Sequence, residues 1–241
     1  MLYAIETKKL TKTFRGKIAV NGIDLTIKKG ELFSLLGTNG AGKTTTIKML
    51  STLILPTSGN IFINGLDVQK NRQEIRKMLN VSPQETAIAP NLSVKENLEF
   101  MAGIYEIENK QEKIQELIHV FHLEEVLKQK AKTLSGGWQR RLSIAISLIN
   151  EPQILFLDEP TLGLDVIARK ELWNIIQALK GNITIILTTH YMEEAESLSD
   201  RIGIMAKGNL VDVGTSEELI KKANVKNFED AFIKIATGGE L

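Results

Sequence analysis

One glycine-rich segment constrains the fold of this chain more than any other feature. It begins directly after the apolar run Leu32 to Leu36, and it consists of Gly37, Thr38, Asn39, Gly40, Ala41, Gly42, Lys43 and Thr44. The apolar run is too short for a helix and predicts a fully buried strand. The pattern Gly, four residues, Gly-Lys-Thr is typical of a loop whose backbone N–H groups surround phosphate oxygens. We therefore expect an α/β core in which a strand, a phosphate-binding loop and a helix follow one another.

The residues at the end of this loop have separate expected roles. A helix that begins near Thr44 and continues toward Pro56 would direct the positive end of its dipole at bound phosphates. Lys43 is expected to contact the β- and γ-phosphates, and the hydroxyl of Thr44 to ligate Mg²⁺. We expect the whole segment from Gly37 to Thr45 to bind the nucleotide. By itself such a loop could be an ordinary turn, but the flanking strand and helix favour a phosphate site.

A pair of acidic residues lies far downstream, at the end of the apolar run Ile154 to Leu157. In a chain with a phosphate loop, an acid that ends a buried strand usually holds the Mg²⁺ shell, and Asp158 fits that role. The adjacent Glu159 could accept a proton from the attacking water as a general base. Two acids at a strand end could also be simple solvent-exposed caps. Together with the phosphate loop they favour Mg²⁺-dependent hydrolysis of ATP or GTP.

A second anion-binding surface is predicted between these two motifs. The segment is Leu134, Ser135, Gly136, Gly137, Trp138, Gln139, Arg140 and Arg141. A hydroxyl and two glycines at a helix start direct donors at phosphate, although the same pattern alone could be a capped loop. This segment resembles the signature motif of ABC ATPases. The resemblance implies that Ser135, Gly136, Gly137 and Gln139 bind the nucleotide of an opposite protomer.

The same resemblance assigns roles to four further residues. Gln84 would join the core to a helical insert, contact the Mg²⁺ together with Thr44 and, through water, Asp158, and sense the membrane partner. Asp165 would lie in the loop that contacts the opposite protomer, and His190 would contact the γ-phosphate. Phe14 is where the family places a ring under adenine, and stacking there needs no hydrogen bonds. Taken singly, a glutamine such as Gln84 or a phenylalanine such as Phe14 would more often be a polar surface residue or a packed core residue.

The spacing of apolar residues predicts how these motifs are connected. The first 30 residues alternate as half-buried antiparallel strands do, as in Ile23 to Ile27, and Ile61 to Gly65 predicts another strand and turn. Between about 85 and 150 the spacing becomes helical, with Val94, Leu98 and Met101 on one face. Ile183 to Leu187 predicts another buried strand. Before it, Asp165 would cap a helix that Gly181 stops.

With the resemblance, the expected fold class is α/β. It has a P-loop NTPase core with a mixed sheet, an N-terminal antiparallel β subdomain and an inserted α-helical subdomain. We expect an ATPase domain over 1–220, with the insert at about 85–150, and a helical tail over 221–241.

Charge and hydropathy exclude some classes of partner. The 241 residues carry a formal net charge of +1, so no overall basic footprint predicts nucleic-acid binding. The absence of cysteine excludes disulfides and thiolate metal sites. No apolar run approaches the ~20 residues that span a bilayer, and the first ten residues do not resemble a signal peptide. We expect a cytoplasmic protein whose role at a membrane would need another chain.

Three segments resemble the ATPase subunits of ABC-2 type exporters, the group of the daunorubicin-resistance and sodium-export proteins: Thr188 to Glu196, Asp200 to Ile202, and Glu229 to Phe232. Val166 and Thr38 depart from this group, which commonly has proline at both positions. The resemblance implies an ATP-hydrolysing subunit that dimerises with an identical or related ATPase and binds an integral membrane permease. It would lie peripherally at the cytoplasmic face of the membrane.

Two other classes of function fit the sequence less well. A soluble ABC protein acting on ribosomes or DNA usually has two cassettes or a long coiled-coil insert, and this chain has one cassette with a modest insert. A scaffold without hydrolytic activity is disfavoured by Glu159 and His190, because both catalytic residues are intact.

Overall fold

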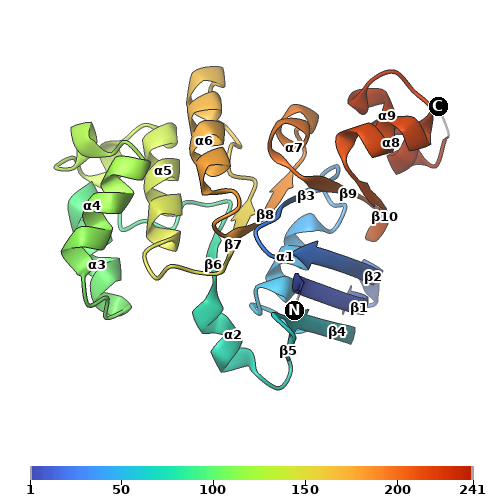
Figure 1. The fold of residues 1–241 in the computed structure, drawn as a ribbon, viewed down its shortest axis with the longest axis horizontal. Coiled ribbons are helices and arrows are strands. Elements are labelled where there is room, and N and C mark those ends of the chain that lie inside the picture. Colours follow the sequence, from blue (N-terminus) through green and yellow to red (C-terminus); the bar gives the residue numbers. More distant parts are fainter. Residues whose placement is uncertain (1, 240–241) are drawn as a thin grey trace.

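The computed structural model describes residues 2–239, and within that range the strands form two sheets (Figure 1). The smaller sheet is antiparallel, because each of its strand pairs runs in opposite directions: β1 with β2, β1 with β4, and β4 with β5. Its strands, in pairing order, are β2 (Lys17–Lys28), β1 (Tyr3–Phe14), β4 (Ser58–Ile63) and β5 (Leu66–Asp67). Alternate residues such as Ile5, Ile23 and Ile61 are buried, which gives each strand one core face. The predicted antiparallel β subdomain is thus confirmed.

The larger sheet is mixed and holds the strands that the motifs follow. Its strands, in pairing order, are β10 (Asn209–Gly214), β9 (Arg201–Ala206), β3 (Leu32–Leu36), β8 (Thr184–Thr189), β7 (Ile154–Asp158) and β6 (Leu79–Ser82). All neighbours from β9 to β6 pair in parallel, and β10 is antiparallel to β9. The carboxyl ends of β3, β7 and β8 therefore meet at one edge, which is where ligands bind in open α/β sheets.

Helix α1 (Lys43–Leu50) packs between the two sheets, since Ile47 and Leu50 share a core cluster with strands of both. It is shorter than expected, because the chain turns at Thr52, whose backbone has a positive φ of 63°. Arg76 of α2 (Arg72–Met78) donates to the hydroxyl of Thr52 at 3.0 Å and helps to hold that turn.

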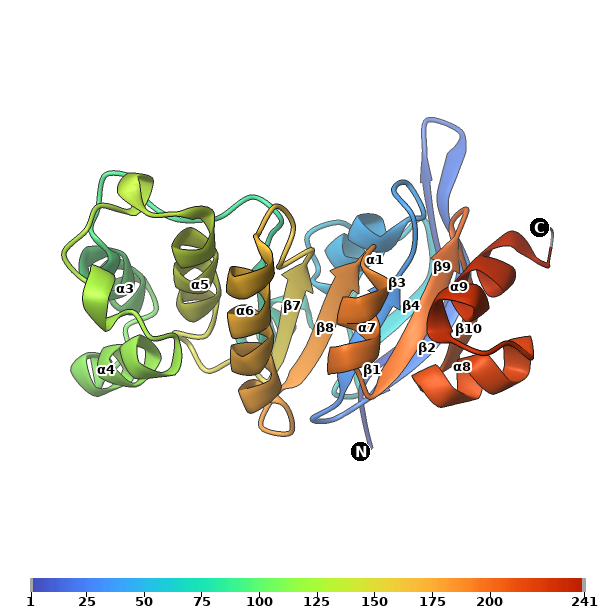
Figure 2. The same cartoon turned by 90° about the horizontal axis from the view of Figure 1, so that it is seen from above.

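The helical insert gathers at one end of the molecule, opposite the carboxyl-terminal helices α8 (Ser216–Ala223) and α9 (Phe228–Thr237) (Figures 1 and 2). Its helices are α3 (Val94–Ile104), α4 (Lys110–Val120) and α5 (Gly136–Ser147). Val94 and Leu98 are fully buried, and Met101 packs against the same cluster, as the helical spacing predicts. The first of these helices begins at Val94, where Ser93 and Glu96 form a capping box.

Two further helices cover the larger sheet beside the insert (Figure 2). They are α6 (Val166–Leu179), which Asp165 caps as expected, and α7 (Met192–Leu198). The domain limits stay predictions, and helix α8 runs across residue 220. Among the helices of residues 2–239, none combines the length and apolar character that crossing a bilayer requires.

Candidate active site

Glycine is needed in the loop after β3 because neighbouring backbone approaches it closely. A Cβ added at Gly37 would lie 2.5 Å from the carbonyl oxygen of Met205, and one at Gly42 would lie 2.6 Å from that of Ala19. Gly42 also has a φ of 103°, which L side chains rarely adopt, and it is the N-cap of α1. The loop therefore packs directly against the backbone of Ala19 and Met205. Helix α1 begins at Lys43, and its first amides are directed at the loop.

The ammonium group of Lys43 lies inside this loop. Its side chain is only 5% exposed, and its Nζ donates to the carbonyl oxygens of Gly37 at 2.8 Å and Thr38 at 3.3 Å. The same Nζ lies 3.4 Å from Oε1 of Glu159. A buried cation so placed would attract the phosphates of a nucleotide, since Coulomb attraction strengthens away from water.

Two oxygen atoms that suit a hard cation meet next to this lysine. The hydroxyl of Thr44 donates to Oδ1 of Asp158 at 3.2 Å, and Asp158 is 6% exposed. The hydroxyl of Thr188, on the neighbouring strand β8, donates to the same Oδ1. Hydroxyl and carboxylate oxygens are the ligands that Mg²⁺ prefers, and it usually takes few of them from protein. Within residues 2–239, no cluster of three or more His, Asp or Glu side chains could hold a metal ion by itself.

Glu159 directs its carboxylate between two basic side chains. Its backbone is left-handed, with a φ of 46°, and its N–H donates to the carbonyl oxygen and the hydroxyl of Thr188. Oε1 faces Lys43, and Oε2 lies 3.3 Å from Nδ1 of His190, which follows β8. No residue in the described range completes a hydrogen bond to that nitrogen. The arrangement brings a carboxylate, an ammonium and an imidazole to one point.

These groups border a cavity of about 850 Å³, a size typical of small-molecule sites. The predicted residues that line it are Asn39, Gly40, Ala41, Gly42, Lys43, Thr44, Thr45, Gln84, Glu159 and His190. Gly37, Thr38 and Asp158 are joined to it only through the hydrogen bonds described above. Sequence reasoning missed Lys17, Ile18, Ala19, Leu162, Lys207 and Gly208. They come from β2, from the loop after β7 and from the turn between β9 and β10, and no motif marks them.

Phe14 is not brought into this cavity. The residue ends β1, is 47% exposed and does not line the cavity, whereas Ile18 of β2 does. The Nζ of Lys12 lies 5.1 Å from the centre of the Phe14 ring. The stacking role of Phe14 stays a prediction.

The signature segment forms a separate surface in the same chain. Ser135 is the N-cap residue of α5, and with Gly137 it lines a hollow that shares no lining residue with the cavity. Gln139 donates through Nε2 to the carbonyl oxygens of Ala131 and Leu134, which shapes the loop before α5. Asp165 accepts from two backbone amides at the start of α6, so its carboxylate is used as a cap.

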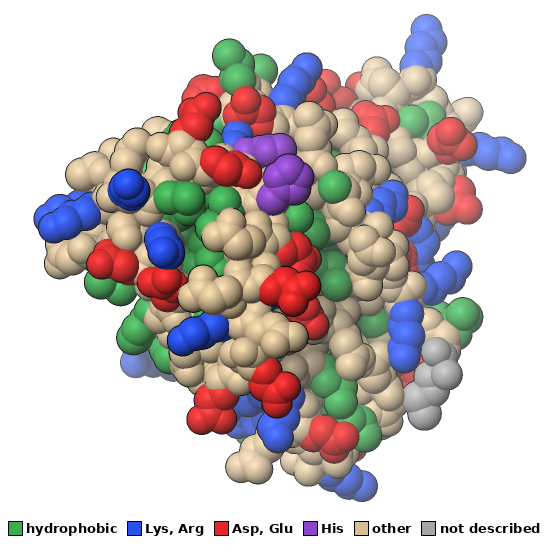
Figure 3. Space-filling view, turned by 60° about the vertical axis from the view of Figure 1, so that its left-hand side comes forward, with side chains coloured by type: hydrophobic (Ala, Val, Ile, Leu, Met, Phe, Trp, Pro, Cys, Tyr) green, Lys and Arg blue, Asp and Glu red, His purple; other side chains and the backbone are tan. Residues whose placement is uncertain are grey.

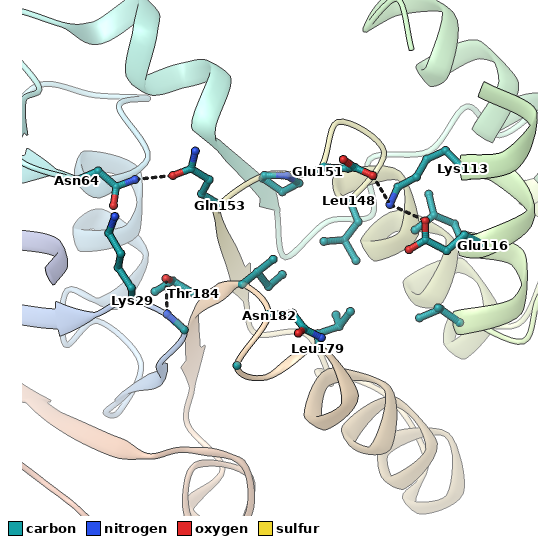
Figure 4. Close-up of a pocket in the computed structure, with 16 residues that line it drawn as sticks. Lys29, Asn64, Lys113, Glu116, Leu148, Glu151, Gln153, Leu179, Asn182 and Thr184 are labelled. Carbon is teal, nitrogen blue, oxygen red and sulfur yellow. Dashed lines mark hydrogen bonds and ion pairs between the residues drawn. The ribbon is translucent and has the colours of Figure 1, made fainter. Parts of the chain in front are cut away.

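A second cavity, of about 610 Å³, lies at the opposite edge of the sheet (Figure 4). It lies between α4 and the amino ends of β7 and β8. At its rim, Lys113 of α4 forms ion pairs with Glu116 of the same helix and with Glu151. Burial would lower the pKa of Lys113, but the hydrogen bonds that its ammonium donates to these two carboxylates raise it. None of the motif residues lines this second cavity, so we assign the chemistry to the first one.

Comparison with known proteins agrees with this geometry. The family described as ABC transporter matches residues 20–162, more than half of the 241 residues. The phospholipid-transporting ATPase ABCA3 of Homo sapiens is 41% identical over 228 residues, which are 92% of this chain but only 13% of that protein. The daunorubicin/doxorubicin resistance ATP-binding protein DrrA of Streptomyces peucetius is 41% identical over 219 residues, 90% of this chain and 66% of DrrA.

A solved structure provides the same comparison in three dimensions. It is an ATP-binding cassette, a dimer in a post-hydrolysis state bound to ADP and Pi. It superposes with a TM-score of 0.78 at 26% identity, over 88% of this chain and 98% of that one. The fold class that the sequence predicts is therefore confirmed, and this chain belongs to the ABC transporter family.

Proposed function

We propose that this chain binds Mg-ATP in the cavity of about 850 Å³ and hydrolyses it to ADP and phosphate. The observation that carries the proposal is the position of the Glu159 carboxylate, between Nζ of Lys43 at 3.4 Å and Nδ1 of His190 at 3.3 Å. A base next to a phosphate-binding lysine is placed to act on a water that attacks the γ-phosphate.

The reaction assigns a distinct step to each group. The oxygen of a water forms a bond to the γ-phosphorus while the bond to the β–γ bridging oxygen breaks, and Glu159 accepts the proton of the water. Lys43 stabilises negative charge on the β- and γ-phosphates, and His190 contacts the γ-phosphate. The oxygens of Thr44 and Asp158 fit a Mg²⁺ ion, with Asp158 acting through water and Gln84 as a further ligand. When bound, Mg²⁺ would neutralise charge on the phosphates.

We further propose that the working form is a dimer with an identical or related ATPase. Ser135, Gly136, Gly137 and Gln139 would bind the nucleotide held by the partner, and Asp165 would contact the partner near that site. The separation of the two surfaces within one chain supports this arrangement. The solved relative is itself a dimer.

The proposed transport partner is an integral membrane permease, and the proposed role is that of the ATPase in an ABC-2 type exporter. DrrA is named for resistance to daunorubicin and doxorubicin, which supports export. Helix α3 exposes Phe100 and Ile104, each 56% exposed, and Tyr105 follows at 40%. Neighbouring exposed apolar side chains are typical of an interaction site. The chain would then lie peripherally at the cytoplasmic face of the membrane.

Nucleic acid is not among the proposed partners. Figure 3 shows the face that comes forward when the insert is turned toward the viewer, and acidic and basic side chains are mixed over it. A protein that follows a phosphate backbone would instead gather lysine and arginine on one face. The near balance of 30 basic and 29 acidic residues supports the same choice.

Lys43→Ala in the full chain tests the proposal. The variant removes a buried cation that would face a polyanion, so ATP affinity by calorimetry and phosphate release should both collapse. Lys48→Ala is the matched control, because Lys48 lies on the same helix and is exposed. Phosphate release by Lys43→Ala near the wild-type rate would refute the site.

A further inference from the structure

Arg140 is a buried cation whose hydrogen-bond partners among the described residues are all backbone carbonyls. It lies in the first turns of α5, a few residues after the cap Ser135, and its side chain is 4% exposed. Nε donates to the carbonyl oxygen of Pro160 at 2.8 Å, and Nη2 donates to that of Asp158 at 2.9 Å. Nη1 donates to the carbonyl oxygens of Pro83 and Gln84. Within residues 2–239, no carboxylate forms a hydrogen bond with its guanidinium.

The guanidinium remains charged at neutral pH despite its burial. Burial lowers the pKa of Arg140 to about 10, while the negative charges of Asp158 and Glu194 act in the opposite direction. Burying a cation without an ion pair is costly, so the side chain must be held by a good set of acceptors. The planar fork of arginine can satisfy acceptors on several sides at once, which the single ammonium of lysine cannot.

The four acceptors belong to two loops that border the nucleotide cavity. Pro83 and Gln84 follow β6, and Asp158 and Pro160 flank Glu159 at the end of β7. Strands β6 and β7 are parallel neighbours, so both loops leave the same edge of the sheet. Arg140 therefore fastens the start of the signature helix to the backbone on both sides of the catalytic acid.

We propose that Arg140 is a positioning residue that links a chain's own nucleotide cavity to its own signature surface. Binding of nucleotide reduces the mobility of the loops at Gln84 and Asp158. Through its hydrogen bonds to both loops, Arg140 also reduces the mobility of the first turn of α5, where Ser135 faces the partner's nucleotide. This inference rests on the proposed function. The next residue, Arg141, has no part in the link, because it pairs with Glu171 of α6 and stacks on Trp138.

Hydrogen exchange on the full chain tests the link without relying on hydrolysis. The chain is studied at concentrations where sedimentation shows single chains, so that no partner's nucleotide contacts α5. Exchange of the amides from Gln139 to Leu142 is measured with and without Mg²⁺ and a non-hydrolysable ATP analogue. In the wild type, nucleotide should slow this exchange about tenfold, the factor that corresponds to one hydrogen bond to a charged group.

Arg140→Lys keeps the charge but cannot reach all four carbonyls, so it should lose the nucleotide effect on α5. Its affinity for the analogue, measured on the same sample, should stay close to that of the wild type. Arg141→Lys, on the same helix, should keep the effect. Arg140→Gln is a second variant, neutral and shorter, and should lose the effect as Arg140→Lys does. Hydrolysis by the dimer should show a lower kcat with an unchanged KM in both Arg140 variants.

The outcomes separate the two proposals. If the wild-type chain does not bind the analogue, the proposed function fails. If the wild type binds it but shows no slowing at α5, or if both Arg140 variants keep the slowing, the function stands and the link through Arg140 is overturned.

Discussion

At the scale of single residues, Glu159 has a strained backbone conformation, and the hydrogen bonds around it must offset the conformational free energy of that strain. A left-handed conformation outside glycine costs roughly 1–3 kcal/mol and is found mainly where structure over-determines it. Here the N–H of Glu159 donates twice to Thr188, which fixes the carboxylate between Lys43 and His190. A motif predicts which residue is the acid but not this conformation, because the φ angle depends on hydrogen bonds that Glu159 donates to Thr188, a strand residue 29 positions away.

Thr188→Val tests that support. Valine keeps the shape of the side chain but removes the hydroxyl that accepts from Glu159 and donates to Asp158. We expect phosphate release in a single turnover to slow about tenfold, as for a lost hydrogen bond to a charged group, with a smaller change in ATP affinity. Thr184→Val is the control at the other end of the same strand, where the hydroxyl accepts from Gly30. Equal slowing by both variants would contradict a specific role of Thr188.

The role of Phe14 is tested by comparing two ligands. If its ring stacks under adenine, Phe14→Ala should weaken ATP binding by about 1–3 kcal/mol and leave the affinity for inorganic triphosphate unchanged. Calorimetry with both ligands separates the base from the phosphates. Ile18→Ala is the comparison, because Ile18 lines the cavity while Phe14 is 47% exposed. A loss of ATP affinity in Ile18→Ala alone would transfer the base contact to Ile18.

At the scale of elements, helix α7 is tied to two neighbours through one buried acid. Oε1 of Glu194 accepts from the hydroxyl of Thr161, in the loop after β7, and from the indole of Trp173 on α6. Oε2 has no hydrogen-bond partner within residues 2–239. Burial raises the pKa of Glu194, and hydrogen bonds from the neighbouring side chains counteract this only in part. The carboxyl therefore holds its proton more tightly in the folded chain than in the unfolded one.

A pH series of unfolding tests this tie. Because the pKa is raised on folding from the ordinary 4.5, the contribution of Glu194 to stability is fully present below pH 4.5. It is lost as the pH rises through the raised value. Glu194→Gln keeps an acceptor for Thr161 and Trp173 but does not titrate. The free energy of unfolding of the wild type, relative to this variant, should therefore fall as the pH rises above 4.5. A difference that stays constant or grows would contradict the raised pKa.

The sequence predicts some of these elements well because they carry strong local signals. Strands β3, β7 and β8 are continuous apolar runs, and α6 has the capping residue Asp165 at its start. Helix α2 and strand β6 were not predicted, because together they span only 72–82 and β6 has just four residues, LNVS, of mixed polarity. The cavity residues from β2 and from the β9–β10 turn were missed for a related reason. Only tertiary packing brings them to the phosphate loop.

At the scale of the whole molecule, the phosphate loop and the signature surface are parts of two different hollows. In an isolated chain, a nucleotide on the phosphate loop would leave the Ser135 surface without phosphate. A symmetric dimer with shared sites removes this mismatch, because each site then takes one surface from each chain. ATP would favour the closed dimer, since only that state lets both surfaces bind the γ-phosphate.

Sharing of sites is tested by mixing two defective chains in a Glu159→Gln background, which should slow water activation and let ATP-bound dimers accumulate. Lys43→Ala disables the phosphate loop, and Ser135→Arg blocks the signature surface. Each variant alone spoils both sites of a symmetric dimer. In a mixed dimer one site receives both lesions, while the other combines an intact Lys43 with an intact Ser135.

The mixture should therefore trap about one ATP per mixed dimer, and either variant alone almost none. Trapped ATP is counted after rapid gel filtration, at concentrations where the Glu159→Gln chain dimerises. If the mixture traps no more than its components, each chain must complete its own site, and the separation of the two surfaces would need another explanation.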